Sequence, residues 1–196
     1  MGAPLAVGGD LEGAEALVLA STSPQRRAIL EQLRIPFVVV PPEYEELGDD
    51  PVEHAAGKAR SVDGGGRVVL GIDTDVFLDG RRLGKAADAG AARVMLELLS
   101  GRTHEVVSGL CLRGDGWEEL ERVVTSVSFR VLPPTEIERY VASGEWQNRA
   151  GAYAVQGLGA SLVDRIDGDY LNVVGLPATL LVHLLAERFP GRYGFG

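Results

Sequence analysis

Apolar and polar residues fall along this chain in blocks that predict short strands and helices in turn. The apolar run at 16–20 predicts a strand, and Ser23-Pro24 after it favours a helix start, because a hydroxyl can cap a helix and proline fits its first turn. The same reasoning predicts strands at 36–40, 68–72, 104–113, 119–132 and 161–166, a hairpin at 76–83, and helices at 24–33, 51–62, 88–99, 135–142 and 177–189. Alternating strands and helices followed by hairpins predict a mixed α/β sheet.

Composition and charge narrow the class of protein. A length of 196 residues suits one domain, or two small lobes around a shared cleft, and 45% hydrophobic with 24% charged residues is typical of a globular chain. The formal net charge of -9 argues against a nucleic-acid or membrane partner, since both need a broad basic face. An anionic ligand would therefore need a local basic cluster.

The start of the chain does not have the pattern of a signal peptide. Residues 1–16 contain acidic side chains and no basic start, and no stretch of the sequence approaches the roughly 20 apolar residues of a membrane span. We expect a flexible tail at 1–16, a single domain over 17–196 and a cytoplasmic location.

The rarer residue types add little chemistry by themselves. Cys111 lies in an apolar run and is predicted to be a small buried hydrophobe. The 3 histidines, His54 among them, are not spaced like zinc ligands. Lys58 and Lys85 are the only lysines among the 19 basic residues, which draws attention to these two positions.

The first candidate site is the predicted helix start at 21–27. Unpaired N–H groups at a helix N-terminus favour an anion, and Ser21, Arg26 and Arg27 would add polar and charged groups for a phosphate. A capped helix whose arginines point into solvent explains these residues equally well.

The second candidate site is Asp73 with Asp75, directly after the buried run at 68–72. Carboxylates past the end of a strand lie where α/β sheets bind ligands, and they can hold a hard cation or act as a general base. A strand-end turn stabilised by aspartates is the alternative. Lys85, a short hairpin away, modestly favours a functional site.

Two further stretches are weaker candidates. The acidic loop at 43–46, which includes Glu43 and Glu46, has the charge run of an ordinary solvated surface. The glycine-rich stretch at 150–157 would let backbone approach a ligand closely, and Gln156 could hydrogen-bond the edge of a base, although a β-turn would have the same sequence.

Together these stretches resemble the Maf family of nucleoside triphosphate pyrophosphatases over residues 19–185. The matching pieces, in order, are 19–24 with Arg26-Arg27, Asp73-Thr74, 83–85, 100–106, 150–157, 168–170 and 172–177. The resemblance implies an elongated mixed β-sheet flanked by helices, with two lobes around a central nucleotide-binding cleft as in inosine triphosphate pyrophosphatases. It also suggests a homodimer.

The implied activity is hydrolysis of a nucleoside triphosphate to the monophosphate and pyrophosphate with a divalent cation, Mg2+ or Mn2+. By this resemblance Asp73 is the general base that activates water, and Glu46 helps Asp73 to hold the metal. Substrate would be bound by residues of several motifs: Ser21, Gln25, Arg26, Arg27, Lys58, Thr74, Lys85 and Gln156. Thr74 and Gln156 resemble the branch acting on dTTP and UTP, a house-cleaning activity on unwanted or modified pyrimidine nucleotides.

The chain departs from the family pattern at a few positions near these motifs. Gln25 stands where the dTTP/UTP branch usually has arginine. Asp75 replaces an apolar residue beside Asp73, where it could add a metal ligand or raise the pKa of a neighbouring group. Ala86 stands in place of a proline. Asn148-Arg149 replaces Asp-Lys, which removes a carboxylate near the expected site.

Two rival functions fit parts of the sequence. The stretch 69–75 also resembles the first motif of haloacid-dehalogenase-type phosphatases, with Asp73 as nucleophile and Asp75 as acid, and Gly168-Asp169 resembles their late acidic motif. The order of the other motifs disfavours this interpretation. A nucleotide-sensing regulator of cell division, which binds triphosphate without hydrolysing it, is the non-enzymatic alternative.

Overall fold

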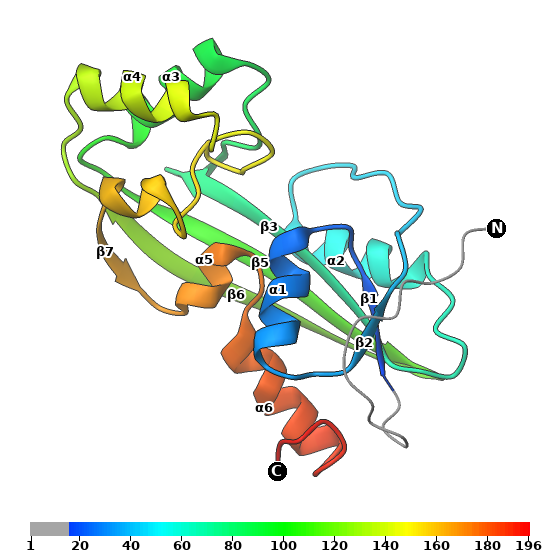
Figure 1. Ribbon diagram of the computed structural model, residues 1–196. Coiled ribbons are helices and arrows are strands. Elements are labelled where there is room, and N and C mark those ends of the chain that lie inside the picture. The colour runs from blue at the N-terminus through cyan, green and yellow to red at the C-terminus, as the bar shows by residue number, and fades with distance from the viewer. Residues whose placement is uncertain (1–15) are drawn as a thin grey trace. The chain divides into compact units, whose positions relative to one another are not determined.

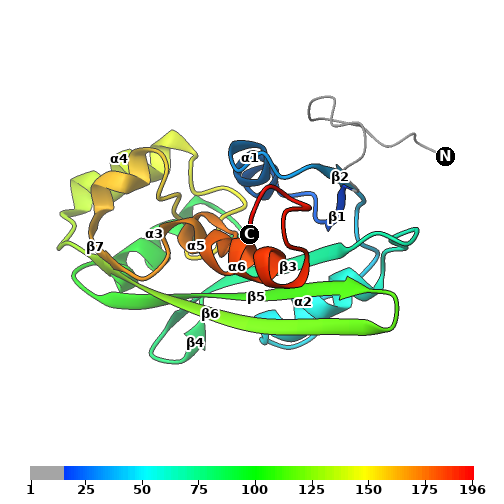
Figure 2. The ribbon, with the colours of Figure 1, turned by 90° about the horizontal axis from the view of Figure 1, so that it is seen from below.

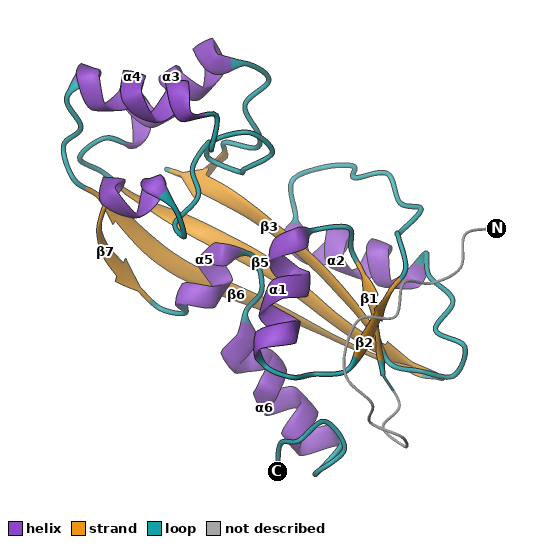
Figure 3. Ribbon diagram, viewed as in Figure 1, coloured by secondary structure: helices purple, strands orange, loops and turns teal. Residues whose placement is uncertain are grey.

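The computed structural model describes residues 16–196 and shows strands and helices alternating along the chain (Figures 1 and 3). The strands are β1 (Leu17–Ala20), β2 (Phe37–Val39), β3 (Val69–Leu78), β4 (Arg81–Arg82), β5 (Thr103–Gly114), β6 (Trp117–Phe129) and β7 (Val163–Asp167). The helices are α1 (Pro24–Gln32), α2 (Pro51–Arg60), α3 (Ala89–Leu99), α4 (Pro134–Ser143), α5 (Tyr170–Val174) and α6 (Ala178–Arg188), with a 3-10 helix η1 at Leu158–Leu162.

The described strands form a seven-stranded sheet in the order β2-β1-β3-β5-β6-β7, with β4 paired to β3. β1 runs parallel to both β2 and β3, whereas β3 with β4 and β6 with β7 are antiparallel. The sheet is therefore mixed and flanked by helices, which confirms the fold class predicted from the sequence.

Two strand predictions are wrong at one end. The strand predicted at 161–166 begins only at Val163, because the two residues before it belong to η1, and β3 extends past its predicted end. The sequence predicts that it ends before Asp73, but β3 continues through Asp73 and Asp75 to Leu78, and the hairpin with β4 turns at Asp79-Gly80 as expected. Both aspartates are buried within the strand, where cationic neighbours offset their charge. Helix α5 lies between β7 and α6 along the chain and is not among the elements that the sequence predicts.

The chain divides into two compact units. Unit 1 contains the described residues up to Asp73 together with Ser108–Val123 and Gly175–Gly196, and unit 2 contains Thr74–Val107 and Val124–Val174. The single domain and the cleft that the resemblance implies stay predictions. The expected tail falls almost entirely within 1–15, outside the described residues. None of the helices within 16–196 combines the length and apolar character needed to cross a membrane.

In unit 1, helices cover both faces of the sheet (Figures 1 and 2). α1 and α6 lie on one face and α2 lies on the other. The α2 side is filled by small apolar residues: Val18, Ala20, Ala55, Ala59, Val62, Val69 and Cys111. Cys111 is buried as predicted, and this burial raises the pKa of its thiol to about 12.

Two glycines allow α2 to lie very close to the sheet. A Cβ atom on Gly71 of β3 would lie 2.2 Å from the carbonyl oxygen of Ala55, and one on Gly109 of β5 would lie 2.2 Å from the carbonyl oxygen of Pro51. Any side chain at either position would push the helix away from the sheet. The close approach sets how far side chains on α2 reach across β3.

In unit 2, α3 and α4 pack side by side, and the apolar core includes Leu96, Val127 and Phe129 (Figure 1). His104 is buried in this core, where its Nε2 lies 2.8 Å from the Tyr153 hydroxyl and its ring contacts Phe129 edge to face. Burial lowers the pKa of His104 to about 4, so the ring is neutral at physiological pH.

Candidate functional site

The candidate site of unit 1 is built where α2 packs on β3. Side chains alternate between the faces of a strand, so Asp73 shares the α2-facing side of β3 with Gly71. His54 and Lys58 lie one turn apart on α2 and therefore project from the same side of the helix. Asp50 caps the start of α2, since its side chain accepts a hydrogen bond from a backbone N–H of the first turn.

Lys58 joins the two carboxylates that the sequence analysis assigns to the metal site. Its Nζ lies 2.6 Å from Oδ1 of Asp73 and 2.6 Å from Oε1 of Glu46. Lys58 and Asp73 are buried, whereas the Glu46 side chain is 40% exposed and comes from the loop between β2 and α2 (Figure 3). The structure thus brings three of the predicted residues into direct contact.

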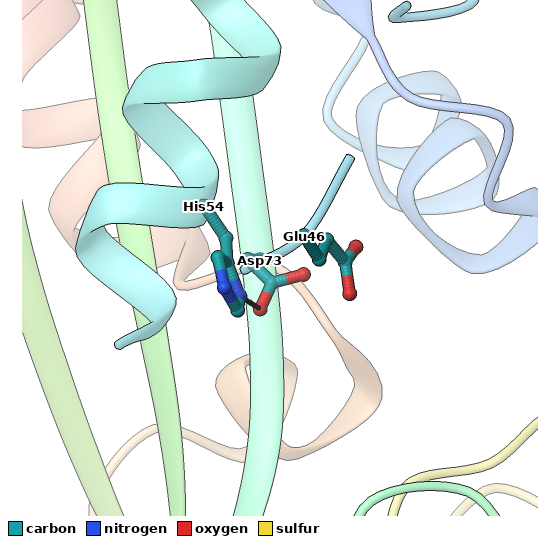
Figure 4. Close-up of side chains that lie close together, drawn as sticks. All are labelled: Glu46, His54 and Asp73. Carbon is teal, nitrogen blue, oxygen red and sulfur yellow. Dashed lines mark hydrogen bonds and ion pairs between the residues drawn. The ribbon is translucent and has the colours of Figure 1, made fainter. Parts of the chain in front are cut away.

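His54 is part of the same cluster, although the sequence analysis assigned it no role. The ring is fully buried, with Nδ1 3.2 Å from Oδ2 of Asp73 and Nε2 3.2 Å from the carbonyl oxygen of Leu47. Figure 4 shows one Asp73 oxygen pointing to His54 and the other toward Glu46. The four-residue spacing from Lys58 on a predicted helix is the signal that could have linked His54 to the site.

Arg26 of α1 is the second cation near Asp73. Its Nε donates to the carbonyl oxygen of Gly175 at 2.9 Å, and its guanidinium also donates to the Ser21 hydroxyl oxygen at 3.0 Å. The buried side chain is therefore fixed at two points.

The start of α1 differs in one detail from its prediction. Ser23 occupies the N-cap position and Pro24 the first turn, as expected. The Ser23 hydroxyl makes no capping hydrogen bond, however, and donates instead to the side-chain oxygen of Gln25 at 3.0 Å. Gln25 and Arg27, the two other substrate-binding candidates on α1, have partly buried side chains. The helix start is thus correctly predicted and its capping hydrogen bond is not.

The surrounding charges control the ionisation of Asp73. Burial by itself raises the pKa of this carboxyl, but the charge and hydrogen bond of Lys58, the charge of Arg26 and the hydrogen bond with His54 outweigh it. The net result is a pKa below the ordinary value. Asp73 is therefore a buried carboxylate that stays ionised at neutral pH.

The donor atoms in unit 1 fit a divalent cation. Ligand atoms of Glu46, His54 and Asp73 all lie within 4.8 Å of one another. Because the Lys58 ammonium already contacts both carboxylates, their oxygens are close enough to share one positive charge. Carboxylate oxygens are the ligands that Mg2+ and Mn2+ prefer.

Unit 2 brings two motif segments together. Lys85 pairs with Ala150 in an isolated β-bridge, and the Gly151 N–H donates to the carbonyl oxygen of the residue before Lys85 at 2.8 Å. Lys85 and Gln156 are exposed, and Thr74 is partly buried on β3. The substrate contacts expected of these three residues stay predictions.

Asp75 has a cationic partner of its own on a neighbouring strand. Its Oδ2 lies 2.6 Å from Nε of Arg82 on the neighbouring strand β4, and its side chain is buried. The departure from the family pattern at Asp75 is thus matched by an arginine that neutralises it. We assign Asp75 a structural role in the hairpin.

A buried carboxylate next to a more exposed one, with a lysine and an arginine beside it, on a mixed α/β sheet, is typical of an enzyme that acts on an anionic substrate. The chain belongs to the Maf-like protein family, whose model matches residues 16–188.

Relatives resemble the chain over nearly its whole length. It is 47% identical over 182 residues to a dTTP/UTP pyrophosphatase of Symbiobacterium thermophilum, covering 87% of this chain and 93% of the relative. It is 46% identical over 181 residues to one of Moorella thermoacetica, covering 87% and 93%. It is 45% identical over 171 residues to one of Thermococcus gammatolerans, covering 84% and 92%.

Proposed function

We propose that this chain is a nucleoside triphosphate pyrophosphatase that hydrolyses dTTP and UTP, or modified pyrimidine nucleotides, to the monophosphate and pyrophosphate. The observation that carries the proposal is the buried, ionised Asp73 beside Glu46, with Lys58 in contact. The name that the relatives share, dTTP/UTP pyrophosphatase, supports both the reaction and the pyrimidine base.

The reaction requires attack of water on the α-phosphorus. The water oxygen becomes part of the monophosphate, the α–β anhydride bond breaks, and pyrophosphate leaves with the bridging oxygen. Asp73 accepts the proton that water loses. Its low pKa makes it a weak base, so orienting the water contributes more than basicity does.

The cationic side chains neutralise the phosphate charge. Arg26 is fixed by Ser21 and Gly175, so its guanidinium is oriented before substrate binds and little reorganisation is needed. Lys58 supplies a second positive charge from α2. Lys85 is an exposed residue of unit 2, and its proposed role in neutralising the phosphates is supported by the resemblance to the family.

A divalent cation, Mg2+ or Mn2+, would be held by Glu46 and Asp73. When bound, it supplies further neutralisation of the phosphate oxygens and makes a coordinated water more acidic. The chain's own contribution is a pair of carboxylates already close enough to share a cation.

The pyrimidine preference is assigned to Thr74 and Gln156. A glutamine amide offers both a donor and an acceptor, which suits the N3–H and carbonyl groups of thymine and uracil. Gln25 replaces the arginine usual in the dTTP/UTP branch, and its side chain accepts a hydrogen bond from Ser23. Gln25 is therefore the position at which this chain's base preference is expected to differ from that of its branch.

The geometry argues against the haloacid-dehalogenase interpretation. Asp73 lies inside β3 and not after its end, and Asp75 is paired with Arg82. Asp169 accepts hydrogen bonds from two backbone N–H groups at the start of α5, which is a structural role.

A homodimer and a cytoplasmic location stay predictions.

The decisive experiment measures product release from a panel of canonical and modified triphosphates with Mg2+ or Mn2+. We expect pyrophosphate and monophosphate from dTTP and UTP. Release from purine triphosphates alone would overturn the pyrimidine assignment. Free phosphate with a phospho-aspartate would support the phosphatase, and tight nucleotide binding without turnover would support the regulator.

A further inference from the structure

We propose that His54 is a positioning residue that fixes Asp73 and the loop carrying Glu46 relative to each other. The inference rests on the proposed function, because it assigns a role within the same cation-binding site. Three features of unit 1 support it.

The first feature is the contact with Asp73. His54 Nδ1 lies 3.2 Å from Oδ2, whereas Lys58 Nζ lies 2.6 Å from Oδ1. The two partners hold different oxygens, so rotation of the carboxylate would break both contacts. His54 thus fixes the plane of the carboxylate and leaves the other oxygen turned toward Glu46 (Figure 4).

The second feature is the contact with the Glu46 loop. His54 Nε2 lies 3.2 Å from the carbonyl oxygen of Leu47, the residue directly after Glu46. The Leu47 side chain is 73% exposed, so apolar burial does not hold the loop at this point. The hydrogen bond to His54 therefore ties the backbone next to Glu46 to α2.

The third feature is a second attachment of the same loop on the other side of Glu46. The Tyr44 ring lies against Gly57 of α2 so closely that a Cβ there would lie 2.1 Å from Tyr44 Cε2. The rings of Tyr44 and His54 are neighbours, with centroids 6.2 Å apart. Glu46 is thus flanked by two attachments to α2, and His54 makes the one after it.

Positioning explains the contacts of His54 better than direct coordination does. A carbonyl oxygen only accepts hydrogen bonds, so Nε2 carries the hydrogen in the contact with Leu47. The ionised Asp73 carboxylate is likewise only an acceptor, so the ring holds Asp73 and Leu47 together when both of its nitrogens carry a hydrogen. Both ring nitrogens are thereby engaged with the chain, in the way that groups around metal ligands orient those ligands.

Amide substitutions separate the two contacts of His54. In His54→Asn the side-chain nitrogen takes the place of Nδ1 and can donate to Asp73. In His54→Gln it takes the place of Nε2 and can donate to Leu47. His54→Leu keeps similar bulk and loses both contacts, and His183→Leu, at an exposed position of α6, is the matched control.

The test is Mn2+ binding to the free protein by calorimetry, at a temperature where circular dichroism shows each variant folded, together with kcat and KM for dTTP. We expect His54→Leu to bind Mn2+ about 10- to 100-fold more weakly than wild type and to lose kcat by a similar factor. KM should change little, because Arg26 and Ser21 are untouched. His54→Asn should recover to within about threefold of wild type, with His54→Gln between the two.

Wild-type Mn2+ affinity in His54→Leu, or His54→Asn no better than His54→Leu, would overturn this inference alone. If His54→Leu does not fold, comparison of His54→Asn with His54→Gln tests the inference. Equal Mn2+ affinities of these two variants, or tighter binding by His54→Gln, would overturn it. A wild-type protein that neither bound Mn2+ nor released pyrophosphate would overturn the proposed function, and this inference with it.

Discussion

At the scale of single residues, Asp73 is defined by the charges around it. Burial disfavours an ionised carboxylate, and an unpaired one would cost several kcal/mol. Lys58 and Arg26 reverse the effect, so that the pKa of Asp73 falls below its ordinary value. The same two cations that stabilise the carboxylate in the free protein are those proposed to bind the substrate's phosphates.

Asp73→Asn tests the role of that carboxylate. Asparagine has almost the same shape but can neither accept the water's proton nor contribute charge to a cation site. We expect kcat for dTTP to fall about 100- to 10,000-fold while nucleotide binding is largely retained. The measurement is pyrophosphate release beside calorimetric binding, with Asp115→Asn in the exposed β5–β6 turn as control. Wild-type turnover in Asp73→Asn would contradict the assignment.

His104 gives a pH-dependent stability that is independent of catalysis. The unfolded chain takes up its proton near pH 6.5, whereas the folded protein does so only near pH 4. The unfolded state therefore binds more protons between these values, and the free energy of unfolding should decrease by up to about 3 kcal/mol as the pH falls from 6.5 to 4.

Replacing His104 by glutamine isolates this effect. The glutamine amide can keep a hydrogen bond to the Tyr153 hydroxyl and does not titrate. Urea unfolding of wild type and His104→Gln at a series of pH values should show a smaller decrease in the variant. Parallel pH profiles for the two proteins would show that His104 is not the cause.

At the scale of elements, the site depends on how closely α2 approaches β3. His54 and Lys58 reach Asp73 because Gly71 and Gly109 present no side chain to the helix. The apolar pattern of 51–62 correctly predicted the helix, but periodicity carries no information on the distance between a helix and its sheet. The glycines are the sequence feature that sets this distance.

Gly71→Ala should weaken both stability and activity. The new Cβ would lie 2.2 Å from the Ala55 carbonyl oxygen and 2.9 Å from the Ala59 backbone nitrogen, so helix backbone must move. We expect a loss of about 1–3 kcal/mol in the free energy of unfolding and, because His54 and Lys58 move with α2, a fall of about 100-fold in kcat.

Chemical denaturation and dTTP hydrolysis measure the two effects of Gly71→Ala. Gly90→Ala in α3 is the matched control, since its new Cβ would meet only the Asp88 side chain at 3.2 Å and alanine favours a helix. Gly90→Ala should keep wild-type activity. Full activity in Gly71→Ala would show that the site tolerates displacement of α2.

At the scale of the whole molecule, the formal net charge is -9, although cationic side chains lie close together around Asp73. Arg26 and Lys58 act on this carboxylate, whereas other arginines form ion pairs at the surface, such as Arg93 with Glu138. The overall charge disfavours long polyanions, and the local charge favours a small one.

Ligand binding should therefore stabilise the protein, and removal of metal should weaken the effect. With Mg2+ and a slowly hydrolysed dTTP analogue at about 100 times its dissociation constant, the midpoint of thermal unfolding should rise by about 5–10 °C. A chelator should reduce this rise, because the cation that links the carboxylates to the phosphates is lost. A thermal shift that is unchanged by chelation would contradict the proposed cation site.

The sequence by itself determined most of the elements and the mixed sheet, because apolar periodicity and turn residues are local properties of the chain, and it named candidate residues of the site that stay predictions. Only the tertiary structure decided the end of β3, the pairing of Asp75 with Arg82 and the place of His54 beside Asp73. Each of these depends on which side chain from another part of the chain neutralises or hydrogen-bonds a buried polar group. Tertiary packing brings that partner into contact, and no single segment of the sequence specifies how distant segments pack together.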